Sequence, residues 1–192
     1  NLEKAKELYK NYPGINISTY DEYVFKLVCY NGHLEVAKWL LEIKPDINIS
    51  AENDYAFRWA CRHGYLEFAK WLLEIKPNIN VSACDEYAFR WVCEKGHLAT
   101  SKWLLEIKPD INISIYNEHA FRLACENGHL EIAKWLLEIK PDINISAENN
   151  WAFRYSKLSI KKWLSHYIPN YDNKNIKTIQ NIGKCSKLFD LI

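Results

Sequence analysis

The fold is decided by the stretch NGHLEVAKWLLEIKPDINIS at residues 31–50, because it returns three more times with few changes. The copies are HGYLEFAKWLLEIKPNINVS at 63–82, KGHLATSKWLLEIKPDINIS at 95–114 and NGHLEIAKWLLEIKPDINIS at 127–146. Ladders of Gly, Trp, Phe and Pro share this step of 32 residues, for example Gly32, Gly64, Gly96 and Gly128, or Trp39, Trp71, Trp103 and Trp135. Coincident ladders over most of the chain predict stacked structural repeats rather than one globular core.

The boundaries of the repeats follow from cutting the chain after each NIS or NVS. This gives a half unit, four full units and a truncated fifth unit that has lost four residues: 1–18, 19–50, 51–82, 83–114, 115–146 and 147–170. The predicted array therefore covers residues 1–170, and residues 171–192 are predicted to be a capping tail. Because the chain contains no Met and begins with Asn1, we expect it to be a piece of a longer product.

Each unit reads as two helices joined by a turn. In the second unit, DYAFRWACRHG places Phe57 and Cys61 four residues apart on one helical stripe, and Gly64 ends the helix. The following YLEFAKWLLEIK has the apolar stripe of a second helix, which Pro77 ends. Asp54 or its neighbour Asn53 at the start is a candidate N-cap. Two such short helices bury a core only by stacking on their neighbours, so an all-α solenoid is expected.

Composition and charge exclude several classes of function. Hydrophobic residues make up 48% and charged residues 26%, and the formal net charge is +1. A chain so close to neutrality offers no strong field for nucleic acid. No apolar run reaches the roughly 18 residues of a membrane span. Neither a glycine-rich phosphate loop nor a nucleophile elbow is present, so we expect no enzyme and no cofactor.

The cysteines follow the repeat rather than a disulfide or metal pattern. Four of the six recur at the step of 32, at Cys29, Cys61, Cys93 and Cys125. Three are followed four residues later by His, but Tyr65 follows Cys61 and breaks the series. A zinc site needs three or four converging ligands, so we expect buried free thiols and no metal.

At this level the chain resembles the ankyrin-repeat family. The resemblance rests on the Gly-His turn, the Leu-Leu helix and the Asp–apolar–Asn ending of residues 31–48, repeated in every full unit. It implies an ankyrin-repeat solenoid that binds proteins. The family's Thr-Pro-Leu-His motif is replaced by Tyr-Ala-Phe-Arg in the second unit, and the Gly after the second helix is replaced by Lys76. We therefore expect short loops or reduced hairpins between the units.

The repeats also resemble the ankyrin arrays of giant DNA viruses that infect amoebae. That resemblance implies a monomeric protein in the cytoplasm of the host cell, whose partner is a host protein. A ubiquitin-ligase substrate adaptor that uses residues 171–192 and a structural component of the virion are the alternatives.

The resemblance also places one row of side chains in the concave groove. The residue after the Arg of each first helix holds this place, and the row is Leu27, Trp59, Trp91, Leu123 and Tyr155. Large apolar side chains exposed in a row favour a binding stripe. The alternative is that they pack between units. The neighbouring Arg58, Arg90 and Arg122 either join the binding surface or hold the stack together.

A possible modification follows from the resemblance alone. Ankyrin asparagines that follow an acidic–apolar pair are targets of a 2-oxoglutarate-dependent hydroxylase, and Asn48, Asn112 and Asn144 fit this pattern. The alternative is that these side chains hydrogen-bond the backbone of their own turns.

Overall fold

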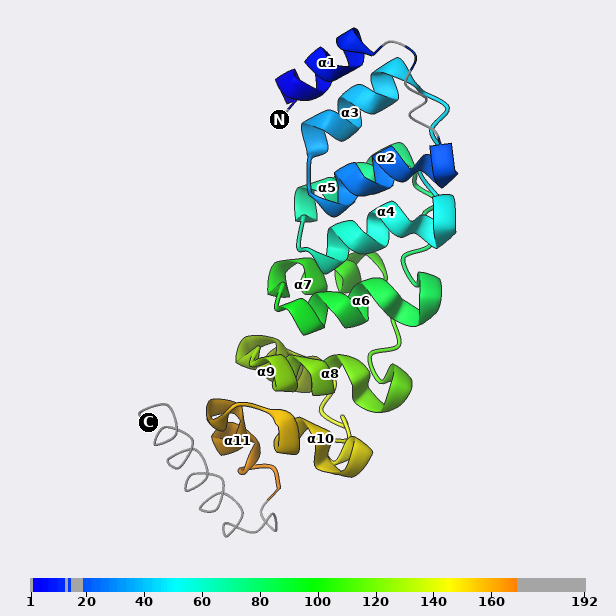
Figure 1. The fold of residues 1–192 in the computed structure, drawn as a ribbon. Helices are drawn as coiled ribbons and strands as arrows, with labels where there is room; N and C mark the ends of the chain where they lie inside the picture. Colours follow the sequence, from blue (N-terminus) through cyan, green and yellow to red (C-terminus); the bar gives the residue numbers. More distant parts are fainter. Residues whose placement is uncertain (1, 13, 15–18, 169–192) are drawn as a thin grey trace, which may run out of the picture.

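The computed structural model describes residues 2–12, 14 and 19–168, and in this part of the chain every regular element is an α-helix (Figure 1). The helices are α1 (Leu2–Asn11), α2 (Thr19–Tyr30), α3 (Leu34–Ile43), α4 (Ala51–Arg62), α5 (Leu66–Ile75), α6 (Ala83–Lys95), α7 (Leu98–Ile107), α8 (Ile115–Asn127), α9 (Leu130–Ile139), α10 (Ala147–Tyr155) and α11 (Leu158–Leu164). The all-α solenoid expected from the repeat is confirmed. The predicted tail at 171–192 lies outside the described residues.

The helices form two layers. The first helices of the units, α2, α4, α6, α8 and α10, pack directly on one another along the array. The second helices, α3, α5, α7, α9 and α11, pack mainly on the first helix of their own unit, and α1 packs on α3 (Figure 1). Neighbouring first helices therefore lie closer together than neighbouring second helices do. We call the exposed side of the layer of first helices the inner face.

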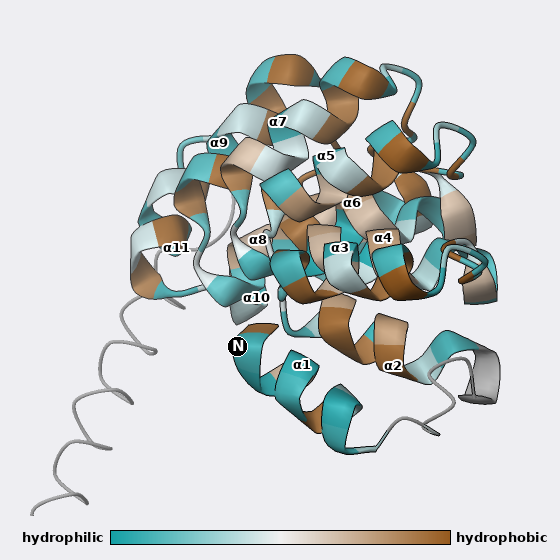
Figure 2. Ribbon diagram, turned by 90° about the horizontal axis from the view of Figure 1, so that it is seen from above, coloured by the Kyte–Doolittle hydropathy of each residue, from teal (hydrophilic) through white to brown (hydrophobic). Residues whose placement is uncertain are grey.

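The core runs continuously through the stack. Each first helix contributes one fully buried Phe, and these are Phe25, Phe57, Phe89, Phe121 and Phe153. Second helices add Leu72, Leu104 and Leu136, which are also buried. Each such side chain stabilises the fold by roughly 1.5–3 kcal/mol. Brown apolar and teal polar segments both occur along the helices (Figure 2), as expected of helices that bury one side.

The turn between the two helices of a unit depends on glycine. Gly64 has a φ of +73°, and a side chain there would overlap the imidazole of His97 from the next unit. Gly96 stands in the same relation to His129. Glycine is therefore required both by the left-handed backbone and by the close approach of the neighbouring unit.

The start of each first helix differs from the prediction. Glu52, Asn53 and Asp54 have φ values of 52°, 55° and 58°, so the right-handed helix begins only at Tyr55. The same left-handed turn occurs at 84–86, 116–118 and 148–150. Asp54 directly precedes the right-handed segment, but its Oδ2 accepts the backbone N–H of Asn80 and its Oδ1 has no hydrogen-bond partner, so the predicted cap is not formed. In the described residues this turn, rather than a β-hairpin, connects neighbouring units.

None of the helices in the described part of the chain has the length and hydrophobicity needed to cross a bilayer.

Candidate functional site

The arginine row holds the left-handed turns. In the second unit, Arg58 Nε donates to the carbonyl of Asn53 and a terminal nitrogen donates to the carbonyl of Glu52, both at 2.8 Å. Arg90 and Arg122 make the same two hydrogen bonds to their own turns. Three consecutive left-handed residues cost roughly 1–2 kcal/mol each, which these charge-assisted bonds offset. The guanidinium groups are thus engaged within the stack.

A buried carboxylate in the turn of each full unit joins that turn to the end of the same unit. Asp54 is only 7% exposed, and its Oδ2 accepts the backbone N–H of Asn80 at 3.0 Å. In the other full units, the backbone N–H groups of Asn48, Asn112 and Asn144 donate to Glu22, Glu86 and Glu118. The start and the end of each full unit are therefore tied together by a hydrogen bond.

The predicted modification sites are the residues whose backbone N–H groups donate to these carboxylates. Asn48, Asn112 and Asn144 are exposed, and the side-chain oxygen of each accepts the backbone N–H two residues later, at 3.1–3.2 Å. Asn80, which lacks the acidic residue of the pattern, makes the same bond at 3.1 Å. The side chains thus serve their turns, and hydroxylation stays a prediction.

The middle of the predicted concave stripe is covered by an arginine that the sequence did not single out. The guanidinium carbon of Arg62 lies 4.5 Å from the ring centroid of Trp59 and 3.9 Å from that of Trp91. Arg62 also donates to the hydroxyl of Tyr87 at 2.9 Å. Both tryptophans are half-buried, as is Leu123. The place of Arg62 holds Tyr30, Glu94 and Glu126 in the other full units, and that variation was the only available signal.

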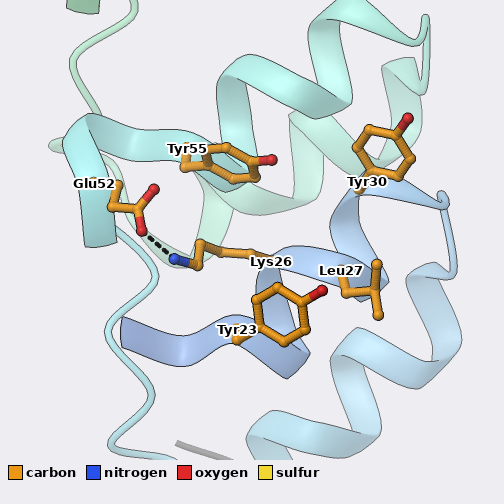
Figure 3. A pocket seen from close by; sticks show the side chains of 6 residues that line it. All are labelled: Tyr23, Lys26, Leu27, Tyr30, Glu52 and Tyr55. Carbon is orange, nitrogen blue, oxygen red and sulfur yellow. Dashed lines mark hydrogen bonds and ion pairs between the residues drawn. The ribbon is translucent and has the colours of Figure 1, made fainter. Parts of the chain in front are cut away.

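The two ends of the stripe are open. Leu27 is 46% exposed and Tyr155 is 47% exposed. Leu27 lies in an opening of about 390 Å³ between α2 and α4, lined also by Tyr23, Lys26, Tyr30, Glu52 and Tyr55 (Figure 3). The side chain of Lys26 reaches past Tyr55 to form an ion pair with Glu52 (Figure 3). The row therefore offers an apolar surface at its ends rather than along its length.

The cysteine and histidine side chains serve packing. Burial raises the pKa of the Cys93 thiol to about 12, and it raises the pKa values of Cys29, Cys61 and Cys125 further. The thiols therefore stay protonated and unreactive. Among the described residues, no group of three or more His, Cys, Asp or Glu side chains is arranged to hold a metal ion.

Burial lowers the pKa values of two histidines at the turns. Desolvation lowers the pKa of His63 and of His97, and neighbouring positive charges add to the effect. Burial also lowers the pKa of His119 on the inner face, and the positive charges of Arg90 and Arg122 lower it further. A neutral imidazole at these positions suits packing against a neighbouring unit.

Comparisons with known proteins agree with this architecture. Models of ankyrin repeats match residues 1–73 (many copies) and 75–147 (three copies). A solved structure of an ankyrin repeat family protein from Legionella pneumophila is similar with a TM-score of 0.62 and 23% sequence identity. The similarity covers 98% of this chain but 62% of that chain, so this chain spans less than two thirds of its length. No curated protein gives a significant match. Two-helix units, Gly turns and family models agree, and the chain belongs to the ankyrin-repeat family.

Proposed function

We propose that this chain is a scaffold that binds a partner protein through its inner face and loop tips. Ankyrin repeats generally mediate protein–protein interaction. The observation that carries the proposal is the exposure of Leu27 and Tyr155 at the two ends of a row whose middle is covered by Arg62. Exposed apolar and aromatic side chains on a rigid surface are typical of binding sites.

The stacked turns support the same proposal. At the loop tips Tyr116 is 51% exposed, and its hydroxyl donates to Asp85 of the preceding unit at 2.5 Å. Asn117 donates in turn to Glu148 of the following unit at 2.6 Å. Tips fixed in this way lose little conformational freedom when a partner binds, which lowers the cost of association.

We extend the proposal to a host-cell protein as the partner of a monomeric, intracellular chain. This extension rests on the resemblance of the repeats to the arrays of giant viruses. The ligase-adaptor alternative depends on residues 171–192, which lie outside the described residues, and no structural feature favours the virion alternative.

The proposal is tested by affinity capture with two charge-introducing double variants of the full chain. Leu27→Glu/Tyr155→Glu alters the inner face, and Ile107→Glu/Ile139→Glu alters the second helices at side chains of similar exposure, 42% and 41%. We expect specific partners to be lost from the first variant and retained by the second. Circular dichroism checks that both fold. Retention by the inner-face variant, or equal loss from both, would remove the inner face from the proposal.

A further inference from the structure

Cations cover aromatic rings in a regular row along the inner face. At successive unit boundaries, the cation of one unit lies over the ring that opens the next first helix: Lys26 over Tyr55 at 5.7 Å, Arg58 over Tyr87 at 4.8 Å and Arg122 over Trp151 at 5.5 Å from the centroid. Arg90 lies close enough to His119 to lower its pKa. The ring that begins this row is Tyr23. It is 56% exposed, and no cation covers it among the described residues.

The opening of Figure 3 lies between the first and second full units, and the equivalent space between the second and third units is filled. The indole of Trp59 and the guanidinium of Arg62 occupy that space, and Arg62 donates to the hydroxyl of Tyr87. At the first boundary the equivalent residues are Leu27 and Tyr30. Leu27 is smaller than an indole, and Tyr30 packs on Trp59 and His63 instead, at 5.0 and 4.8 Å between ring centroids.

The opening of Figure 3 is therefore the place of a missing guanidinium. Tyr55 corresponds to Tyr87 of the next unit, and among the described residues its hydroxyl has no hydrogen-bond partner. The rings of Tyr23, Tyr30 and Tyr55 line the opening. An electron-rich wall with free hydroxyl acceptors suits a planar cation that carries several donors.

The charges in the opening leave room for such a cation. Among the described side chains, the ionic ones that line it are Lys26 and Glu52, and they are paired with each other across the unit boundary. The next boundary already accommodates two cations together, since Arg58 lies over Tyr87 while Arg62 donates to the same residue. A second cation beside Lys26 therefore repeats an arrangement that the fold contains.

We propose that the opening between α2 and α4 binds an arginine side chain of the partner protein. The guanidinium stacks on the exposed tyrosine rings and donates to Tyr55, as Arg62 does with Tyr87 one unit later. This inference rests on the proposed scaffold function and names the chemistry that its first two units recognise.

The probes are acetylated, amidated pentapeptides Gly-Gly-Xaa-Gly-Gly, in which Xaa is arginine, citrulline, lysine or glutamate. Citrulline has the shape of arginine without its charge. Titrations of the full chain are followed by NMR, using the Leu27 methyl groups and the tyrosine ring protons of the opening. We expect saturable shifts with the arginine peptide, and binding weaker by about five-fold or more with citrulline. No shift with arginine, or equal binding of citrulline, overturns the proposal.

Two variants localise the effect. Leu27→Trp/Tyr30→Arg transplants the second unit's residues into the first and fills the opening from within, so arginine binding should be lost while the fold is kept. Tyr23→Leu removes an exposed ring and should weaken binding without unfolding the chain. The matched control is Tyr155→Leu, which removes a similarly exposed ring at the far end and should leave arginine binding unchanged. Binding that survives the transplant in a folded chain contradicts the proposal.

The outcome separates this inference from the scaffold function itself. A protein captured through the inner face that is retained by the Leu27→Trp/Tyr30→Arg variant leaves the scaffold in place and removes the arginine site. Capture that depends on neither face removes the inner face from the proposed function, whatever the pentapeptides do.

Discussion

The carboxylate of Asp54 accepts the backbone N–H of Asn80 at 3.0 Å and so ties the left-handed turn of the second unit to the end of that unit, where the third begins. Asp54 is buried and Asn80 is exposed, so the bond is partly shielded from water. The two ends of the unit are therefore held together by a side chain and a backbone amide, in addition to the apolar core.

Asp54→Ala is expected to lower the free energy of unfolding by about 1–3 kcal/mol, because the partly buried N–H of Asn80 loses its acceptor. Asp54→Asn keeps an acceptor oxygen and should lose less. Urea unfolding followed by circular dichroism measures both. The control is Asp110→Ala, whose exposed carboxylate pairs only with Lys108 and should change stability by less than about 0.5 kcal/mol. Equal effects at Asp54 and Asp110 would contradict the role of the buried bond.

Arg122→Lys should destabilise the array by about 1–3 kcal/mol, although the charge is kept. Lysine has a single nitrogen and cannot donate to the carbonyls of Asn117 and Tyr116 at once, as the guanidinium does at 2.7 and 3.0 Å. Arg154→Lys is the matched control, since Arg154 is exposed and donates only to the Tyr155 hydroxyl, at 3.5 Å. The two midpoints of urea unfolding are compared. A loss at Arg154 as large as that at Arg122 would count against the turn-holding role.

Asn53 tests the backbone of the turn directly, because it is exposed and has a φ of 55°. Asn53→Val should destabilise by about 1–2 kcal/mol, since a β-branched residue fits the left-handed region poorly. Asn53→Gly should be close to neutral, because the relief of strain and the greater freedom of the unfolded chain oppose each other. Thermal unfolding of both variants gives the comparison. A valine as well tolerated as glycine would show that the turn is not left-handed in solution.

The repeat ladders predicted the helices, their ends at Gly64 and Pro77, and the continuous core, because these depend on local periodicity that recurs in every unit. The left-handed turn was not predicted. Asp54 has the residue type of an N-cap, and local sequence cannot tell whether its carboxylate bonds its own helix or an amide 26 residues away. That choice depends on how closely the units stack.

The candidate site was also predicted only in part. The row of Leu27 and Tyr155 was found, because it repeats at a fixed place beside the arginines. The contact of Arg62 with Trp59 and Trp91 was not predicted, because the neighbours of an inner-face residue come from adjacent units. Tyr23 and Tyr30 were not predicted as site residues either, because only the structure shows that they line the opening between α2 and α4.

Acidification is expected to weaken the array through His97. Burial lowers the pKa of His97, and the charges of His129, His63 and Lys95 lower it further. The folded chain therefore binds the proton less readily than the unfolded chain, in which the group titrates near 6.5. The stabilising contribution is complete above that value and is lost as the pH falls through the lowered pKa of the folded state.

Thermal unfolding as a function of pH measures this contribution. His97→Gln should flatten the fall in melting temperature on the acid side, because the ring that resists protonation is gone. His33→Gln, at an exposed turn position, should leave the fall unchanged. An unaltered pH profile for His97→Gln would assign the acid sensitivity to other groups.

The contact of Arg62 with Trp91 should appear as a coupling energy in a double-mutant cycle. The guanidinium lies 3.9 Å from the Trp91 centroid and is also held by Trp59 and Tyr87, so its orientation is fixed before any partner binds. Combining Arg62→Gln with Trp91→Leu should reveal a coupling of about 1–2 kcal/mol in the free energy of unfolding. The control cycle pairs Trp91→Leu with Arg154→Gln, two side chains with no contact to each other, and should be additive within about 0.5 kcal/mol. Additivity in both cycles would mean that Arg62 merely covers Trp91, and the middle of the inner face would then be available to a partner by a simple side-chain rotation.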